Sequence, residues 1–124
     1  MDDDSSLAYL PTHLSLSTCT VDVETLATSV VVTVSGELDM ADADQVGQVL
    51  AKAVQSGTPI VRLQVADLTF ADSSAIKAIL TGALGADERG VKFELVNPRG
   101  VVQRLLDVTG LTEVLTIVHE PIAP

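Results

Sequence analysis

Two serines follow an aspartate directly ahead of the most regular helical pattern in the chain. Asp72, Ser73 and Ser74 precede a stripe of apolar residues that begins at Ile76 and repeats at helical spacing. Aspartate and serine commonly cap helices, because their side-chain oxygens accept hydrogen bonds from free N–H groups of the first turn. Those N–H groups and the helix dipole also favour an anion, including a phosphate attached to a serine. The stretch predicts a helix start that needs no further function, and either hydroxyl could carry such a phosphate.

Three carboxylates lie at a second junction, where an expected strand over residues 29–37 leads into an expected helix. Asp39 closes the run Gly-Glu-Leu-Asp at the end of that strand, and Asp42 and Asp44 follow it. Acidic side chains are stabilised at the start of a helix by its dipole. We therefore expect Asp42 and Asp44 to be solvated and to add negative charge beside Asp39.

The residues that catalysis would need are missing from the sequence around Ser73. A nucleophilic serine requires a base such as histidine, but His13 and His119 both lie near expected edges of the domain. Neither a G-x-S-x-G elbow nor a phosphate-binding glycine loop occurs. Cys19 is the only cysteine, so it forms no internal disulfide, and no metal-ligand cluster can be assembled. We expect a protein that is not an enzyme and holds neither a metal nor a cofactor.

Composition narrows the class of partner. The 124 residues suit a single domain, and seven basic against seventeen acidic residues give a net charge of −10. Nucleic acid and anionic membranes are therefore not expected partners. The start of the chain resembles no signal peptide, and no apolar run is long enough to cross a bilayer. We expect the protein to be cytoplasmic.

The hydrophobic pattern predicts an α/β domain with a mixed β-sheet covered by α-helices. The expected order is β-β-α-β-α-β-α-β, and one face of the sheet is expected to be more open than the other. Valines on both faces of the second strand place that strand near the sheet centre. Strands are predicted over residues 14–23, 29–37, 60–65, 92–96 and 115–118, and helices over 43–54, from behind 72–74 to 89, and over 99–109.

The ends of the chain are predicted to lie outside this domain. Residues 1–12 form an expected disordered acidic tail, the domain covers 13–119, and 120–124 form a C-terminal tail in which prolines prevent strand pairing. Gly110 is expected to end the third helix in a left-handed conformation, with Leu111 packing back onto the helix.

Three short runs, taken in order and spacing, resemble the STAS domain, and in particular the bacterial anti-sigma factor antagonists. They are Gly-Glu-Leu-Asp at 36–39, Asp-Leu-Thr-Phe-Ala-Asp-Ser-Ser at 67–74 and Val-Thr-Gly-Leu at 108–111. The resemblance covers nearly all of residues 14–119 and is much more specific than any one of the runs. It implies the STAS fold.

The resemblance also implies a function and a phosphorylation site. In that family an anti-sigma factor, itself a serine kinase, phosphorylates the serine that matches Ser73, and a serine phosphatase reverses this. The dephosphorylated antagonist binds the anti-sigma factor and frees the sigma factor. Asp39 matches an aspartate near the phosphorylation site, and Asp72 and Ser74 flank the serine. This chain has Ala75 where the family usually has glycine, which adds a methyl group where a partner approaches.

The expected partner surface combines these residues with the exposed face of the helix that follows, where Lys77 and Thr81 point outward. A phosphate adds about −1.5 to −2 charges at neutral pH. We expect its repulsion from acidic neighbours and its bulk to exclude the partner while the fold stays intact. The predicted contact residues are Asp39, Asp72, Ser73, Ser74, Ala75 and Lys77.

One alternative shares the fold and differs in role. STAS domains also serve as scaffolds in stress-sensing assemblies and as small subunits of membrane transport complexes, including lipid-transport complexes. Such a protein would bind its partner without phosphorylation at Ser73. A homodimer formed through a strand edge is compatible with either role.

Overall fold

The computed structural model describes residues 10–121. Most of the predicted acidic tail lies outside this range, as do residues 122–124 of the predicted C-terminal tail. In chain order the elements are β1 (His13–Ser15), β2 (Cys19–Thr25), β3 (Val30–Leu38), α2 (Ala43–Gln55), β4 (Ile60–Gln64), β5 (Leu68–Ala71), α3 (Ser73–Glu88), β6 (Lys92–Val96), α4 (Val101–Thr109), the 3-10 helix η1 (Leu111–Glu113) and β7 (Thr116–Val118).

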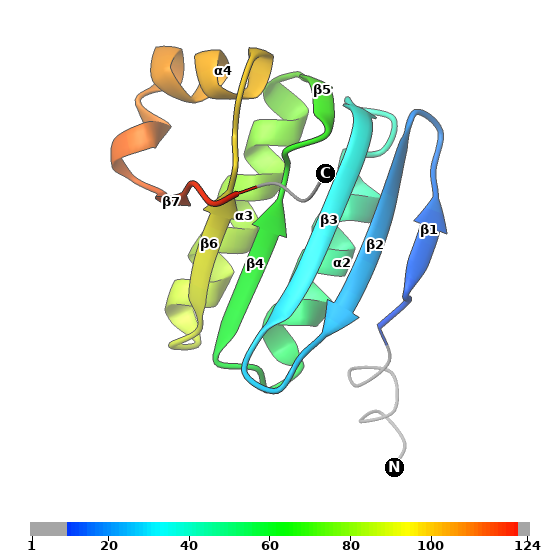
Figure 1. The fold of residues 1–124 in the computed structure, drawn as a ribbon, viewed down its shortest axis with the longest axis vertical. Coiled ribbons are helices and arrows are strands. Elements are labelled where there is room, and N and C mark those ends of the chain that lie inside the picture. Colours follow the sequence, from blue (N-terminus) through cyan, green and yellow to red (C-terminus); the bar gives the residue numbers. More distant parts are fainter. Residues whose placement is uncertain (1–9, 122–124) are drawn as a thin grey trace.

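The strands form one mixed sheet in the spatial order β1-β2-β3-β4-β6-β7, and β5 pairs with the end of β3 (Figure 1). β1, β2 and β3 are antiparallel neighbours, whereas β3, β4, β6 and β7 run parallel to one another. β3 has neighbours on both sides, as its valines on both faces predicted. The predicted α/β class with a mixed sheet is confirmed.

The predicted order of elements lacked two short strands. The single strand expected over residues 14–23 is a hairpin, in which Leu14 pairs with Val21. The segment between β4 and α3, where no strand was predicted, contains β5, which pairs with β3 beyond a register shift at Gly36 and Glu37. Strands of three or four residues are too short to show a clear alternation, so only the tertiary pairing reveals them.

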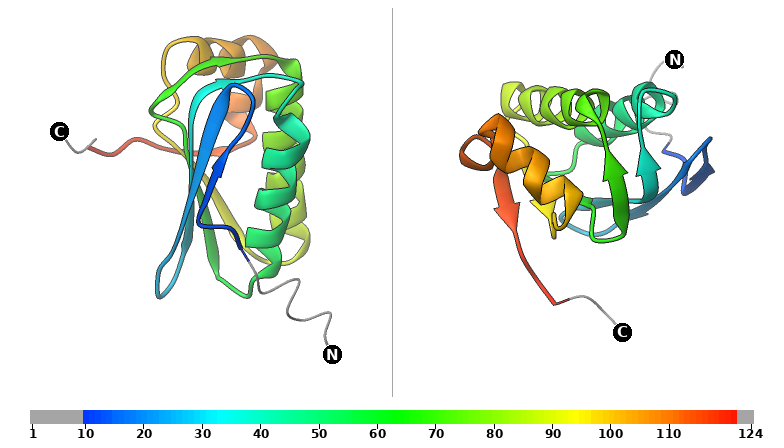
Figure 2. Two further views of the ribbon diagram at one scale, coloured as in Figure 1. Left: turned by 90° about the vertical axis from the view of Figure 1, so that its right-hand side faces the viewer. Right: turned by 90° about the horizontal axis from the view of Figure 1, so that it is seen from above.

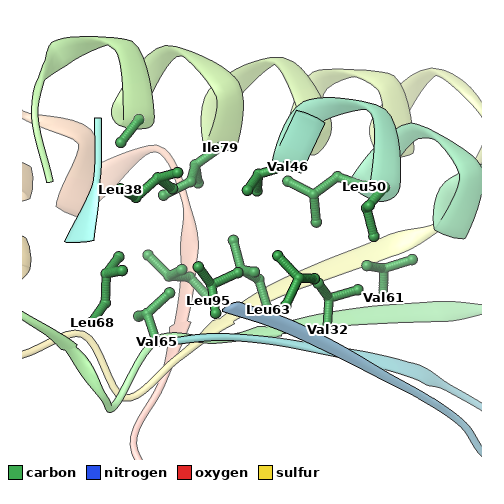
Figure 3. Close-up of a cluster of buried hydrophobic side chains, with 14 of the residues drawn as sticks. Val32, Leu38, Val46, Leu50, Val61, Leu63, Val65, Leu68, Ile79 and Leu95 are labelled. Carbon is green, nitrogen blue, oxygen red and sulfur yellow. The ribbon is translucent and has the colours of Figure 1, made fainter. Parts of the chain in front are cut away.

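Helices α2 and α3 lie side by side on one face of the sheet, and α4 lies across its end (Figure 2). The core fills the space between this helix pair and the strands (Figure 3). Burial of this aliphatic surface is the main source of stability. The largest fully buried side chains include Leu38, Leu50, Leu63, Ile79, Leu95 and Leu106.

The opposite face of the sheet has no helix over it within residues 10–121, which confirms the predicted open face (Figure 2). Arg62 of β4 lies on this face and pairs with Glu94 at 2.8 Å and with Glu120 at 2.5 Å. The Glu120 N–H also donates to the Asn97 side-chain oxygen at 2.9 Å. Hydrogen bonds from Arg62 hold the pKa of Glu120 below its ordinary value. Glu120, assigned to the C-terminal tail from the sequence, is thus attached to the sheet.

The end of α4 has the predicted form. Gly110 takes a left-handed conformation with φ of 78°, which glycine adopts without a steric penalty. Leu111 packs against the core behind it. The chain then turns through η1 into β7.

Candidate functional site

Ser73 is the first residue of α3, and Asp72 caps that helix. The Asp72 carboxylate accepts a hydrogen bond from the Ala75 N–H at 3.1 Å, and the Asp72 carbonyl accepts one from the Ile76 N–H at 3.1 Å. The Ser73 side chain is exposed, whereas Ser74 is half-buried. The predicted helix cap is confirmed, and the structure favours Ser73 over Ser74 as the more accessible hydroxyl.

Strand pairing brings the residues around Asp39 next to the start of α3. β5 lies beside β3 with Ala71 opposite Leu38, and the Asp72 N–H donates to the Leu38 carbonyl at 3.3 Å. Asp39 and Asp72 are the next residues along the two paired strands. They therefore leave the same edge of the sheet as neighbours, although they are far apart in the sequence.

Asp39 also starts the turn that leads into α2. Its carboxylate accepts the Ala41 N–H at 3.0 Å, and its carbonyl accepts the N–H groups of Asp42 and Ala43 at 3.1 and 2.9 Å. These bonds hold the Asp39 side chain against its own loop. Met40 lies at the tip of the turn with 77% of its surface exposed.

A groove of about 540 Å³ runs between α2 and α3, from the Met40 turn along the outer surface of both helices. The two helices approach closely, because a β-carbon on Gly47 would lie 3.9 Å from that of Ala78. The structure thus brings together the start of α3, the turn after β3 and the helix face predicted for partner contact. Six side chains on its walls are Met40, Asp44 and Gln48 from the β3–α2 side and Ser74, Lys77 and Thr81 from α3.

Ala75 is fully buried, with 0% of its surface exposed. Its methyl group belongs to the hydrophobic core and does not reach the surface on which we expected it to meet a partner. The Ala75 N–H is occupied by the cap bond to Asp72. Alanine at this position therefore strengthens the first turn of α3 and leaves the Ser73 hydroxyl uncovered.

Replacing Ala75 with glycine is expected to lower the free energy of unfolding by about 1 to 2 kcal/mol, because glycine is a poorer helix former and a buried methyl group is lost. Ala51→Gly, at an exposed position of α2, is the matched control. It should lower the free energy of unfolding by only about 0.5 to 1 kcal/mol. Urea unfolding followed by far-UV circular dichroism measures both, since the chain has no tryptophan. Equal losses in the two variants would contradict a core position for the Ala75 methyl group.

Asp42 is a structural residue that the sequence did not reveal. We expected it to be solvated, but only 1% of its surface is exposed. Its carboxylate accepts the N–H groups of Ser17 and Thr18 at 3.1 and 2.8 Å and the Thr18 hydroxyl at 3.3 Å. Burial by itself raises the pKa of Asp42, but the hydrogen bonds from Thr18 and Ser17 outweigh it and hold this pKa below its ordinary value. Asp44 remains exposed, as expected.

Cys19 is buried next to the Asp42 carboxylate. Burial and the charge of Asp42 raise the pKa of the Cys19 thiol to about 11. Because the thiolate is the reactive form, this cysteine is poorly nucleophilic at neutral pH.

The histidines lie away from α3. His13 bonds the Asp22 carboxylate at 2.6 Å across β1 and β2, with the Ser15 hydroxyl at 3.4 Å from its other ring nitrogen. All three are exposed on the sheet edge, where water competes for these bonds. His119 follows β7. Neither histidine borders Ser73, so the base that a nucleophilic Ser73 requires does not come from them.

Neither a metal-binding cluster nor a helix that could cross a bilayer occurs in the part of the chain that the structure describes. No three or more histidine, cysteine, aspartate and glutamate side chains in residues 10–121 gather in a way that could hold a metal ion. Over the same residues, none of the helices has the length and apolar character that a bilayer crossing needs. The candidate site consists of hydroxyls, carboxylates, one lysine and the exposed Met40 side chain.

The fold and this site define a small α/β domain whose surface chemistry gathers at the start of one helix. The model of the family described as Mlab, STAS domain, matches residues 21–118, from within β2 to the end of β7. The chain belongs to the STAS domain family, as the three sequence runs predicted. No curated protein matches the sequence.

Solved structures share this fold at low sequence identity. An anti-sigma factor antagonist from Mycobacterium paratuberculosis is 24% identical, with a TM-score of 0.74 over 81% of this chain and 85% of its own. The Bacillus cell fate determinant SpoIIAA, in its phosphorylated form, is 20% identical, with a TM-score of 0.67 over 82% and 91%. A sulfate transporter family protein from Wolinella succinogenes is 15% identical, with a TM-score of 0.66 over 77% and 80%. One fold serves proteins with different roles, so function must be argued from the site.

Proposed function

We propose that this chain is an anti-sigma factor antagonist that acts in the cytoplasm. In its unphosphorylated form it binds a serine-kinase anti-sigma factor and releases a sigma factor. Phosphorylation of Ser73 switches it off, and a serine phosphatase resets it. The observation that carries this proposal is the exposed Ser73 at the first position of α3, close to the Asp39 turn and next to Ser74, which lines the groove.

The proposed contact surface is compact and has an apolar anchor. Met40 projects from the turn after β3, and the groove behind it is lined by small and polar side chains from α2 and α3. Exposed large apolar side chains next to a concave surface are typical of protein interaction sites. Ser73 directly precedes Ser74, which lines the groove. We therefore expect a group added to Ser73 to lie at the rim of this docking surface.

A phosphate on Ser73 is expected to block docking and to leave the fold intact. It adds about −1.5 to −2 charges close to the carboxylates of Asp39 and Asp72. The Ser73 side chain points to solvent, so the phosphate displaces no core residue, and the free N–H groups of the α3 start favour an anion. Like charges facing a partner cost several kcal/mol, and we expect about a hundredfold loss of affinity.

Mass spectrometry after incubation with ATP and candidate serine-kinase anti-sigma factors tests the proposal. We expect one phosphate on the wild type and on the matched control Ser74→Ala, and none on Ser73→Ala. Calorimetric titration then compares the affinities of the two forms. Tight binding without any phosphate would contradict the switch and favour the alternative of a scaffold or a subunit of a transport complex.

A further inference from the structure

Lys77 lies one helical turn beyond Ser73 on α3. Residues four apart on a helix are neighbours on its surface, and their side chains can form an ion pair. Both side chains are exposed. The ion pairs found in residues 10–121 involve Arg62, Lys92, Arg99 and His13, and none of them occupies Lys77. The Lys77 ammonium is therefore available to a new anion on the same face of α3.

Lys77 is also the one cation among the described residues that line the groove between α2 and α3. Asp44 lines the same groove from α2. The groove thus offers a partner one negative group from α2 and one positive group from α3. An arrangement of this kind fits a partner segment that presents an acidic side chain towards α3.

We propose that Lys77 is the second half of the switch: a phosphate on Ser73 pairs with the Lys77 ammonium and removes from the groove its one cation. This inference rests on the proposed function, whose phosphorylation site it uses. Phosphorylation then acts in two ways, because it adds negative charge and also occupies the group that an acidic side chain of the partner needs. The α3 wall of the groove changes from positive to negative.

The ion pair can be tested without any partner. Phosphoserine is incorporated at position 73 of the full chain during translation, and the phosphate is titrated by ³¹P NMR in three backgrounds: wild type, Lys77→Gln, and Lys52→Gln as the matched control. Lys52 lies in the last turn of α2, remote from Ser73. Circular dichroism verifies that each variant is folded.

In the wild type, the phosphate dianion is expected to bind a proton about twofold more weakly than the phosphate dianion in Lys77→Gln does. The reason is that an i, i+4 ion pair is worth a few tenths of a kcal/mol. The Lys52→Gln curve should overlay the wild type. Identical curves for wild type and Lys77→Gln would overturn the proposal.

A second experiment measures the affinity of the unphosphorylated protein for the anti-sigma factor. Lys77→Gln is expected to weaken binding about two- to fivefold, and Lys52→Gln to leave it unchanged. A Lys77→Gln affinity equal to that of the wild type would refute the role of Lys77 in docking. If no anti-sigma factor binds, the proposed function fails, while the ³¹P titration still decides whether Lys77 holds the phosphate.

Discussion

Replacing Asp42 with alanine is expected to lower the free energy of unfolding by about 3 kcal/mol, because it removes a buried carboxylate to which two backbone N–H groups donate. The carboxylate holds two backbone N–H groups and one hydroxyl in the turn of Ser17 and Thr18. The Thr18 hydroxyl also donates to the Glu37 carbonyl at 2.9 Å, so the two backbone N–H groups are the donors that depend on Asp42. Asp44→Ala is the control, since Asp44 is exposed on the first turn of α2, and should change stability by less than about 0.5 kcal/mol. Urea unfolding measures both.

The same residue predicts a dependence of stability on pH. Because the pKa of Asp42 is lower in the folded state, its ionised form stabilises the protein above the unfolded pKa of about 3.9. This contribution is lost as the pH falls through the lowered folded value. The difference in stability between wild type and Asp42→Asn should therefore be largest near neutral pH and shrink below about pH 4. A difference that is constant from pH 7 to pH 3 would show that the charge of Asp42 is not what stabilises the turn.

Replacing Gly36 with alanine is expected to lower the free energy of unfolding by about 2 to 4 kcal/mol. Gly36 has φ of +96°, and a β-carbon built there would lie 2.7 Å from the Thr18 carbonyl oxygen. That oxygen is backbone and accepts the Glu37 N–H at 2.9 Å, so it cannot move away without breaking the bond. The variant must therefore strain β3 or detach the turn that contains Thr18.

Gly85→Ala provides the matched control for this substitution. Gly85 lies inside α3, has no positive φ, and a β-carbon there meets nothing within 4 Å. Alanine is the better helix former, so this variant should gain about 0.5 to 1 kcal/mol. If Gly36→Ala lowers the free energy of unfolding by less than about 1 kcal/mol, the hairpin turn shifts easily. That result would contradict the inference that Asp39 is held rigidly.

Gly36 and Asp42 explain how the fold positions the candidate site. Gly36 lets β3 pass close to the hairpin turn and then shift register, after which β5 can pair with its end. Asp42 ties the same turn to the start of α2. Asp39 lies between these two attachments, so its turn is held from both sides. Variants at either position are expected to weaken partner binding as well as stability.

Local patterns in the sequence predicted most of the elements. Alternation predicted β3 and β6, helical spacing predicted α2 and α3, and the sequence Asp-Ser-Ser located the start of α3. Each of these depends on residues close together in the chain, and a period of 2 or 3.6 is visible there. The strands β1 and β5 were missed, because each is short and exists through pairing with a distant segment.

By itself, the sequence determined the α/β class and the STAS family, and it predicted a phosphorylation site at Ser73. Only the tertiary structure decided that Asp42 is buried and accepts hydrogen bonds from the hairpin turn, that the Ala75 methyl group faces the core, and that Lys77 lines a groove with Asp44. The physical reason is that composition and periodicity report on neighbours in the chain. Burial and hydrogen bonding depend on which distant segments the folded sheet brings together.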